Sequence, residues 1–289
     1  MRFELTEDQR DLAAALEGLL ASSDTVAVAR AWADGDHGPG QKLWARLSEL
    51  GVTMLATEAT PVELCVAFEA LGRHAVPGPW VETAAYLPIA LGHELDRMAT
   101  VAVPPHVPFA LDADVAEEVY VGRTLVTEIG AMRTSVDRTR RLFEVAGDEL
   151  VAWDEAFDSA VLALSAQLLG AGERVLADSV AYVKQRKQFG REIGSYQAIK
   201  HALADVRIAL DFARPLVFGA ALGEISPSAA KVAAADGAYL ASRTGLQVHG
   251  AVGYTAELDL SIWITKIRAL VTAWGTPSAH RERLLAEVL

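Results

Sequence analysis

The sequence predicts a mainly α-helical protein in which helices at both ends of the chain flank a short β region. Apolar residues recur with the spacing of one helix face over residues 1–100 and again over residues 154–289. Residues 101–153 instead contain short β-branched runs separated by Pro, Asp and Gly, which are typical of strands and turns. We therefore expect an N-terminal helical domain, a short middle β segment and a C-terminal four-helix bundle, with these boundaries.

Four helices are expected in the N-terminal domain. The first begins after Thr6, a good N-cap residue, and its leucines form one stripe: Leu12, Leu16, Leu19 and Leu20. The other three are expected over residues 38–52, 61–80 and 80–92. The second ends near Gly51, and Gly72 and Pro77 are expected to stop the third.

The C-terminal bundle is predicted from four long helical patterns and a short terminal one. The first pattern runs from about residue 155 to 187, and the second places apolar residues at Ile199, Leu203, Val206 and Leu210. The third begins with Ser226 as N-cap and Pro227 at the first helical position. The fourth begins near Thr255, and the terminal helix follows Thr276 and Pro277.

The composition excludes several classes of protein. With 26 basic and 38 acidic residues in 289, the net charge is −12, which argues against nucleic acid as the main partner. Hydrophobic residues make up 52% of the chain, too many for disorder. A single cysteine, Cys65, excludes an intrachain disulfide and argues against a cysteine-based metal site, so we expect a buried thiol. We expect no membrane span and no signal peptide, and hence a cytoplasmic protein.

A basic joint, YVKQRKQFGREIGSYQAIKHAL, lies between two long helical patterns at residues 182–203. Gly190 permits a turn, and Ser195 is placed to cap the next helix. Arg186 offers a rigid fork of donors suited to phosphate, and Phe189 offers a flat face for an aromatic ring. Two interpretations are open: a pyrophosphate or nucleotide contact, and a solvated basic loop in which Phe189 fills the core.

A glycine-rich segment, GLQVHGAVGYTAELDL, occupies residues 245–260. Gln247 and His249 are polar groups in apolar company, and three glycines surround them: Gly245, Gly250 and Gly253. Such glycines permit close backbone approach to a ligand, and the N-terminus of the next helix is placed to face an anion. The alternative is a simple helix–helix turn. A Rossmann fold is not indicated, because no GxGxxG loop follows a strand.

Together, RKQFGREIGSYQAIKHALAD and QVHGAVGYTAELDL resemble the acyl-CoA dehydrogenase family. Tyr182, one turn before Arg186, and the order and spacing of the segments also fit. The resemblance covers residues 155–289 well, 1–100 moderately and 100–152 poorly. It implies a flavoprotein that forms α,β double bonds in acyl-CoA thioesters, with a helical domain, a β domain and a four-helix bundle.

The resemblance also implies roles for the two segments. In the family, the R-x-x-F-G motif binds the pyrophosphate and adenosine of the neighbouring subunit's FAD, and its counterparts here are Arg186, Gln188 and Phe189. The Q-x-x-G-x-x-G segment reaches the adenosine part of the same FAD. Its counterparts are Gln247, His249, Gly250 and Gly253.

The resemblance fails at the catalytic base, the carboxylate that removes the α-proton while hydride passes to the flavin. The family's Y-E-G-T glutamate corresponds to Trp274, and the alternative base position, on the first bundle helix, corresponds to Ala160. Neither residue can accept a proton, so we assign no catalytic residue. Asp158 and Glu257 are the carboxylates nearby in sequence and the candidates for a displaced base.

The truncated middle region departs from the family as well. It has no counterpart of the T-E-x-x-x-G-S-D and W-I-T-N type segments, which hold the flavin ring and cover the acyl chain. WITKI at residues 263–267 lies in a predicted helix and is not such a segment.

These departures predict a non-catalytic β subunit of an α2β2 FAD-dependent acyl-CoA dehydrogenase. A full-length α subunit would supply the base, the flavin-ring pocket and the acyl-CoA site, and this chain would complete the shared FAD site. The expected substrate is a bulky thioester such as a steroid side-chain CoA. Two alternatives remain open: an active homo-oligomeric dehydrogenase with a relocated base, and a flavin-free stabilising or regulatory subunit.

Overall fold

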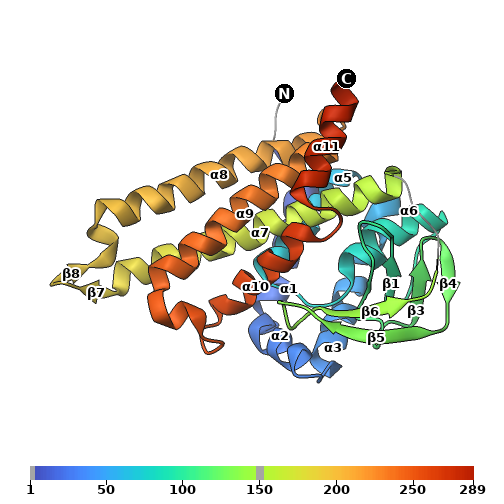
Figure 1. Ribbon diagram of the computed structural model, residues 1–289, viewed down its shortest axis with the longest axis horizontal. Coiled ribbons are helices and arrows are strands. Elements are labelled where there is room, and N and C mark those ends of the chain that lie inside the picture. Colours follow the sequence, from blue (N-terminus) through green and yellow to red (C-terminus); the bar gives the residue numbers. More distant parts are fainter. Residues whose placement is uncertain (1–3, 148–152) are drawn as a thin grey trace.

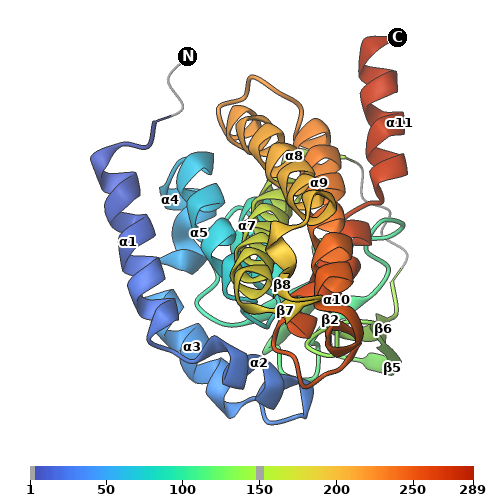
Figure 2. The ribbon, with the colours of Figure 1, turned by 90° about the vertical axis from the view of Figure 1, so that its left-hand side faces the viewer.

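A computed structural model describes residues 4–147 and 153–289 and confirms the predicted order of helices, small sheets and helices (Figure 1). The N-terminal region forms a layer of helices beside the long C-terminal helices (Figure 2). Its helices are α1 (Glu7–Ala21), α2 (Thr25–Ala33), α3 (Gly38–Glu49), α4 (Leu55–Glu58), α5 (Pro61–Arg73) and α6 (Leu87–Leu91), with a π-helical turn at Glu82–Tyr86.

The N-terminal helix boundaries follow local signals in part. The Thr6 side chain accepts from the Gln9 backbone N–H, which confirms the predicted cap of α1. Gly51, at φ 89°, follows the end of α3 as predicted. The helix predicted over 80–92 is confirmed as an unbroken helical segment over 80–91 that contains a π-helical turn before α6. Helices α2 and α4 were not predicted.

The β region consists of two small three-stranded sheets. Strand β1 (Ala99–Ala102) pairs in parallel with β3 (Glu118–Val121), which pairs antiparallel with β4 (Thr124–Val126). Strand β6 (Arg141–Val145) is central in the second sheet, antiparallel to both β2 (Ala110–Leu111) and β5 (Ile129–Thr134). Only a small cluster around Phe143 belongs to this region alone, as expected for so few strands.

The C-terminal helices form the predicted bundle. They are α7 (Glu155–Gln185), α8 (Gln197–Ala221), α9 (Pro227–His249), α10 (Leu260–Thr272) and α11 (Pro277–Val288). The Thr276 side chain accepts from the Ala279 N–H, which confirms the predicted cap of α11. Ser226 precedes α9 with Pro227 at the first position, as predicted, but its side chain makes no capping hydrogen bond.

Two predicted helix starts in the bundle are wrong. Ser195 does not cap α8, because it lies in a 3₁₀ turn and its hydroxyl donates to the Glu192 carbonyl at 2.7 Å. Helix α10 begins at Leu260 and not near Thr255, because residues Gly250–Tyr254 form a 3₁₀ turn of their own.

Helices α5 and α7 cross in close contact and unite the N-terminal helices and the bundle in one hydrophobic core. A Cβ atom at Gly72 would lie 2.0 Å from the Gln167 carbonyl oxygen, and one at Gly170 would lie 1.9 Å from that of Glu69. Gly72 therefore permits the crossing rather than ending α5, which continues to Arg73. Cys65 is fully buried here, as predicted, and burial raises the pKa of its thiol.

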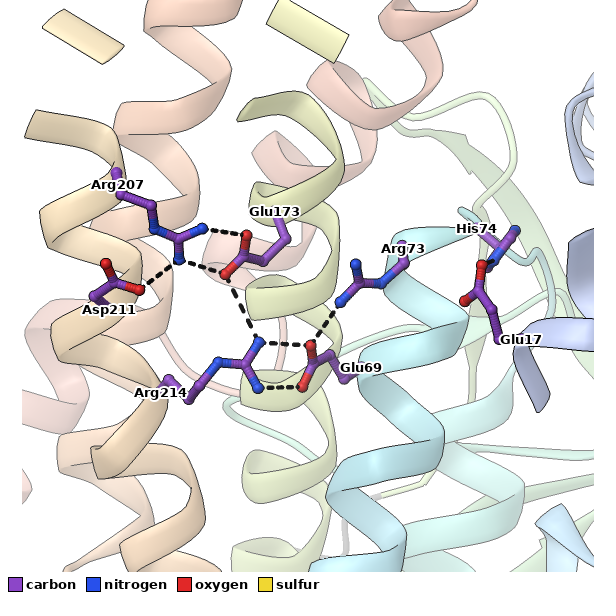
Figure 3. A network of polar contacts seen from close by, with 8 residues as sticks. All are labelled: Glu17, Glu69, Arg73, His74, Glu173, Arg207, Asp211 and Arg214. Atoms are coloured by element: carbon purple, nitrogen blue, oxygen red, sulfur yellow. Dashed lines mark hydrogen bonds and ion pairs between the residues drawn. The ribbon is translucent and has the colours of Figure 1, made fainter. Parts of the chain in front are cut away.

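A network of ion pairs links α5 and α7 to α8 next to this crossing (Figure 3). Glu69 on α5 accepts from Arg73 at 2.8 Å and from Arg214 on α8 at 2.7 Å. Glu173 on α7 accepts from Arg207 on α8 at 2.6 Å. The arginines of α8 thus join two helices that belong to different ends of the chain.

Helix α7 is the central element of the bundle. By length and composition it is apolar enough to cross a membrane, contrary to the expectation from the sequence, but 83% of its apolar window is buried inside the protein. Its hydrophobicity is thus explained by its place in the core.

Candidate functional site

The basic joint forms a β-hairpin between α7 and α8. Strands β7 (Lys187–Gln188) and β8 (Arg191–Glu192) pair antiparallel across a two-residue loop, Phe189 and Gly190. Both loop residues have positive φ, 52° and 79°, as a type I′ turn requires. Phenylalanine rarely adopts this conformation, so the hairpin holds a bulky aromatic side chain where asparagine or glycine is preferred.

The hairpin projects from one end of the bundle (Figure 1). Phe189 is 90% exposed, so the interpretation in which it fills the core is wrong. Arg186 and Gln188 are exposed too, and within residues 4–147 and 153–289 no hydrogen bond or ion pair engages the Arg186 guanidinium. Arg191, by contrast, lies over the Tyr196 ring at 4.0 Å. The hairpin therefore presents a free cation and an aromatic face to the outside.

The glycine-rich segment lies at the same end of the bundle. Gln247 is exposed on the last turn of α9, and Gly250, at φ 63°, faces open space. His249 is buried, with Nδ1 2.8 Å from the Gly245 carbonyl oxygen and its ring stacked on Tyr182 at 4.1 Å. The stacked rings of Tyr182 and His249 thus join the two segments, and His249 lies beneath the surface rather than on it.

Gly253 is the remaining predicted site residue. It is buried, and a Cβ atom there would lie 3.1 Å from the Leu246 carbonyl oxygen. This glycine therefore allows the 3₁₀ turn to fold back against α9. It also lines a cavity of about 480 Å³ together with Leu246 and Tyr254.

Both base positions lie in the core. Ala160 is fully buried in α7. Trp274 is 1% exposed and packs against Tyr86 and Phe157, with ring centroids 5.1 and 5.3 Å apart. Trp274, the predicted counterpart of the usual base, is thus engaged in aromatic contacts.

The two candidates for a displaced base lie in different settings. Asp158 accepts from both terminal nitrogens of Arg283, one of them at 2.9 Å, so its carboxylate is engaged in a bidentate ion pair. Glu257 is exposed in the turn before α10, where its carbonyl accepts from Arg30 at 3.3 Å. Neither carboxylate lies next to Trp274 or Ala160 in the core.

Glu82 is the carboxyl group that the sequence analysis missed. It lies in the π-helical turn, is 1% exposed, and its Oε1 accepts from the Trp274 indole at 3.4 Å. Burial raises the pKa of Glu82, and the charge of Arg140 opposes this only in part. The signal was available in WVETAAYL, where one carboxyl interrupts an apolar run, because buried carboxyl groups with shifted pKa values gather at functional sites.

The projecting end of the bundle suits a dinucleotide cofactor. Arg186 and Gln188 are free donors, Phe189 is a free ring, and Gly250 leaves room for close approach. The described ranges contain no group of three or more His, Cys, Asp or Glu side chains that could hold a metal ion.

Comparison with known proteins identifies the family. A sequence profile of the acyl-CoA dehydrogenase C-terminal domain matches residues 151–289. The acyl-CoA dehydrogenase IpdE2 of Mycolicibacterium smegmatis is 30% identical, and the match covers 96% of this chain and 97% of that protein.

Solved structures show the same fold. A chain of the ChsE4–ChsE5 complex from Mycobacterium tuberculosis superposes with a TM-score of 0.80 at 20% identity, over 100% of this chain and 99% of that one. The steroid ACAD Tcur3481–Tcur3483 gives a TM-score of 0.81 at 20% identity, over 98% of each chain. With a full-length relative at 30% identity and a matching C-terminal domain, this chain belongs to the acyl-CoA dehydrogenase family.

Proposed function

We propose that this chain is the non-catalytic β subunit of an α2β2 acyl-CoA dehydrogenase and completes the FAD site of a full-length α subunit. Family membership implies an FAD-dependent oxidoreductase. Trp274 and Ala160 are the counterparts of the family's base positions, both are buried, and neither side chain can accept the α-proton. The α subunit would therefore supply the base and bind the acyl-CoA.

The observation that carries this proposal is the projecting hairpin. Phe189 is 90% exposed and also keeps a positive φ, which is costly for a bulky residue. Beside it, the exposed Arg186 guanidinium makes no hydrogen bond or ion pair within the described residues. They are explained if a ligand held by another chain covers them. The named pairs among the structural relatives, ChsE4–ChsE5 and Tcur3481–Tcur3483, favour a partner subunit.

Each exposed group has a defined part in this half-site. The Arg186 guanidinium would bind the pyrophosphate, and the Phe189 ring would pack on the adenine. The Gln188 and Gln247 amides would bind the adenosine part, and Gly250 would let the backbone approach it. Bound FAD would accept the hydride on its flavin ring. In this proposal the chain contacts the adenosine and pyrophosphate part of FAD and not the ring.

A substrate class and a location can also be proposed for the complex. One structural relative is described as a steroid ACAD, so we propose a bulky CoA thioester, such as that of a steroid side chain, as the substrate of the complex. We propose the cytoplasm as its location, because the apolar stretch of α7 is accounted for by core packing.

The test is Arg186→Ala in the complex with its co-expressed α subunit. Loss of a charge-assisted hydrogen bond should weaken FAD retention by about 1.5–3 kcal/mol, measured as the FAD dissociation constant. Lys187→Ala is the matched control, because it also removes one positive charge next to Arg186. Successive side chains of a strand point to opposite faces, so the Lys187 side chain lies on the other face of β7 from Gln188. Undiminished FAD retention in Arg186→Ala would contradict the proposal, as would a yellow, catalytically active chain purified alone.

A further inference from the structure

A cavity remains beside Trp274, away from the projecting hairpin. It has a volume of about 510 Å³ and lies between the π-helical turn, the β1–β2 connection, the segment before β6 and the end of α10. Its apolar lining includes Val107, Phe109 and Leu142. The size is typical of a site for a small organic molecule.

A buried carboxyl group lines this cavity. Glu82 is 1% exposed, and the Trp274 indole donates to its carboxyl group over a long distance of 3.4 Å. A buried polar group that is weakly hydrogen-bonded is costly unless something else engages it. Burial raises the pKa of Glu82, so its carboxyl group keeps a proton to a higher pH than an exposed glutamate does.

Two guanidinium groups give the cavity a positive balance. Arg140 and Arg268 both line it, and neither has a carboxylate within ion-pair distance in the parts of the chain that the structure describes. Arg268 lies over the Tyr239 ring at 5.6 Å. His106 also lines the cavity, and burial lowers its pKa, so it is neutral at pH 7. Arg140 is thus the guanidinium without a partner in the described residues, and an apolar cavity that it lines suits a ligand with a hydrocarbon body and one negative charge.

We propose that this cavity binds an apolar carboxylate. The carboxylate lies at the Arg140 guanidinium, and the hydrocarbon body lies against Val107 and Phe109. The protonation state of Glu82 affects the affinity for this ligand, because an ionised Glu82 would place a negative charge beside the ligand carboxylate. This site would be additional to the FAD half-site, and its ligand would be bound by this chain alone.

The test is calorimetric titration of the full chain, expressed alone, with octanoate and with 1-octanol as the uncharged analogue. Octanoate should bind more tightly than octanol. Arg140→Gln should weaken octanoate binding about tenfold, the effect of one charge-assisted hydrogen bond. Arg138→Gln is the matched control, because that neighbouring arginine is 69% exposed and pairs with Asp34, so it should leave the affinity unchanged.

A pH series separates the role of Glu82. In the pH range where octanoate itself is ionised, its affinity should fall as pH rises and Glu82 ionises. Glu82→Gln should flatten that slope while keeping an acceptor for Trp274. Burial raises the pKa of Asp112, near Arg140, to about 7, and this contribution is the same in both proteins. Arg140 and Arg268 keep their charge throughout, His106 stays neutral above pH 7, and Lys231 and His280 lie behind Trp274 and are unchanged in both proteins. Equal binding of octanoate and octanol, an unchanged Arg140→Gln affinity, or equal pH slopes would overturn the proposal. None of these outcomes bears on FAD retention, so the two proposals fail separately.

Discussion

At the scale of single residues, Trp274, the proposed counterpart of the family's base, belongs to a buried polar cluster. Trp274 has a φ of 54°, and its carbonyl is 2.9 Å from Nε2 of His280. That nitrogen must donate, so Nδ1 accepts from the Ser228 hydroxyl at 2.9 Å. Lys231 donates to the Ala273 carbonyl at 3.0 Å. The cluster thus holds Trp274 in an unusual backbone conformation. Its hydrogen bonds, as described, require a neutral His280.

This requirement predicts a loss of stability in acid. Burial, more than the nearby charges of Lys231 and Arg283, lowers the pKa of His280 to about 4, below its usual 6.5. The unfolded chain therefore binds the proton first, so the stabilisation is complete above pH 6.5 and is lost as pH falls towards 4. Between pH 7 and 4.5 the wild type should lose roughly 2–3 kcal/mol more than His280→Gln, measured by urea unfolding. Parallel losses in the two proteins would contradict this account.

At the scale of elements, the hairpin allows folding and function to be separated. Asn-Gly is the preferred pair for a type I′ turn, so Phe189→Asn should leave the melting temperature unchanged or slightly raised. The same change removes the aromatic face, and FAD retention in the complex should weaken by about 1 kcal/mol or more. A lower melting temperature would show that Phe189 is structural after all.

The crossing of α5 and α7 depends on glycine in a different way. Gly72→Ala should destabilise the chain by about 3 kcal/mol in urea unfolding, because the new methyl group would overlap the backbone of α7. Gly18→Ala, in α1, is the control. That glycine has nothing within 4 Å, so alanine should stabilise its helix by about 0.5–1 kcal/mol. Similar effects of the two changes would show that the helices can move apart.

The elements also show what the sequence can and cannot predict. Caps such as Thr6 and Thr276 are local, so helix starts that depend on them were predicted correctly. The hairpin was missed because Phe189 does not favour its observed φ. The contact between Glu82 and Trp274 joins residues 192 positions apart, and only the tertiary packing reveals it. The motif residues could be named from the resemblance, whereas the burial of His249 could not.

At the scale of the whole molecule, the two ends of the chain share one core, and the truncated β region adds little to it. The chain therefore folds around α7 without needing a complete middle domain. The hairpin lies at the far end of the bundle from the β region (Figure 1), and under the half-site proposal it is the part of this chain that would contact FAD.

This division predicts the flavin content of the complex. If this chain contributes only the half-site at its hairpin, the purified α2β2 complex should hold one FAD per αβ pair. Native mass spectrometry would give the chain stoichiometry, and flavin absorbance after denaturation would give the FAD content. One FAD per chain would mean that this subunit holds a flavin ring of its own despite Trp274, and the half-site proposal would then be wrong. The double variant Arg186→Ala, Phe189→Asn removes both hairpin side chains. If its complex still assembles but contains no FAD, the hairpin binds the partner's cofactor and is not needed to bind the partner itself.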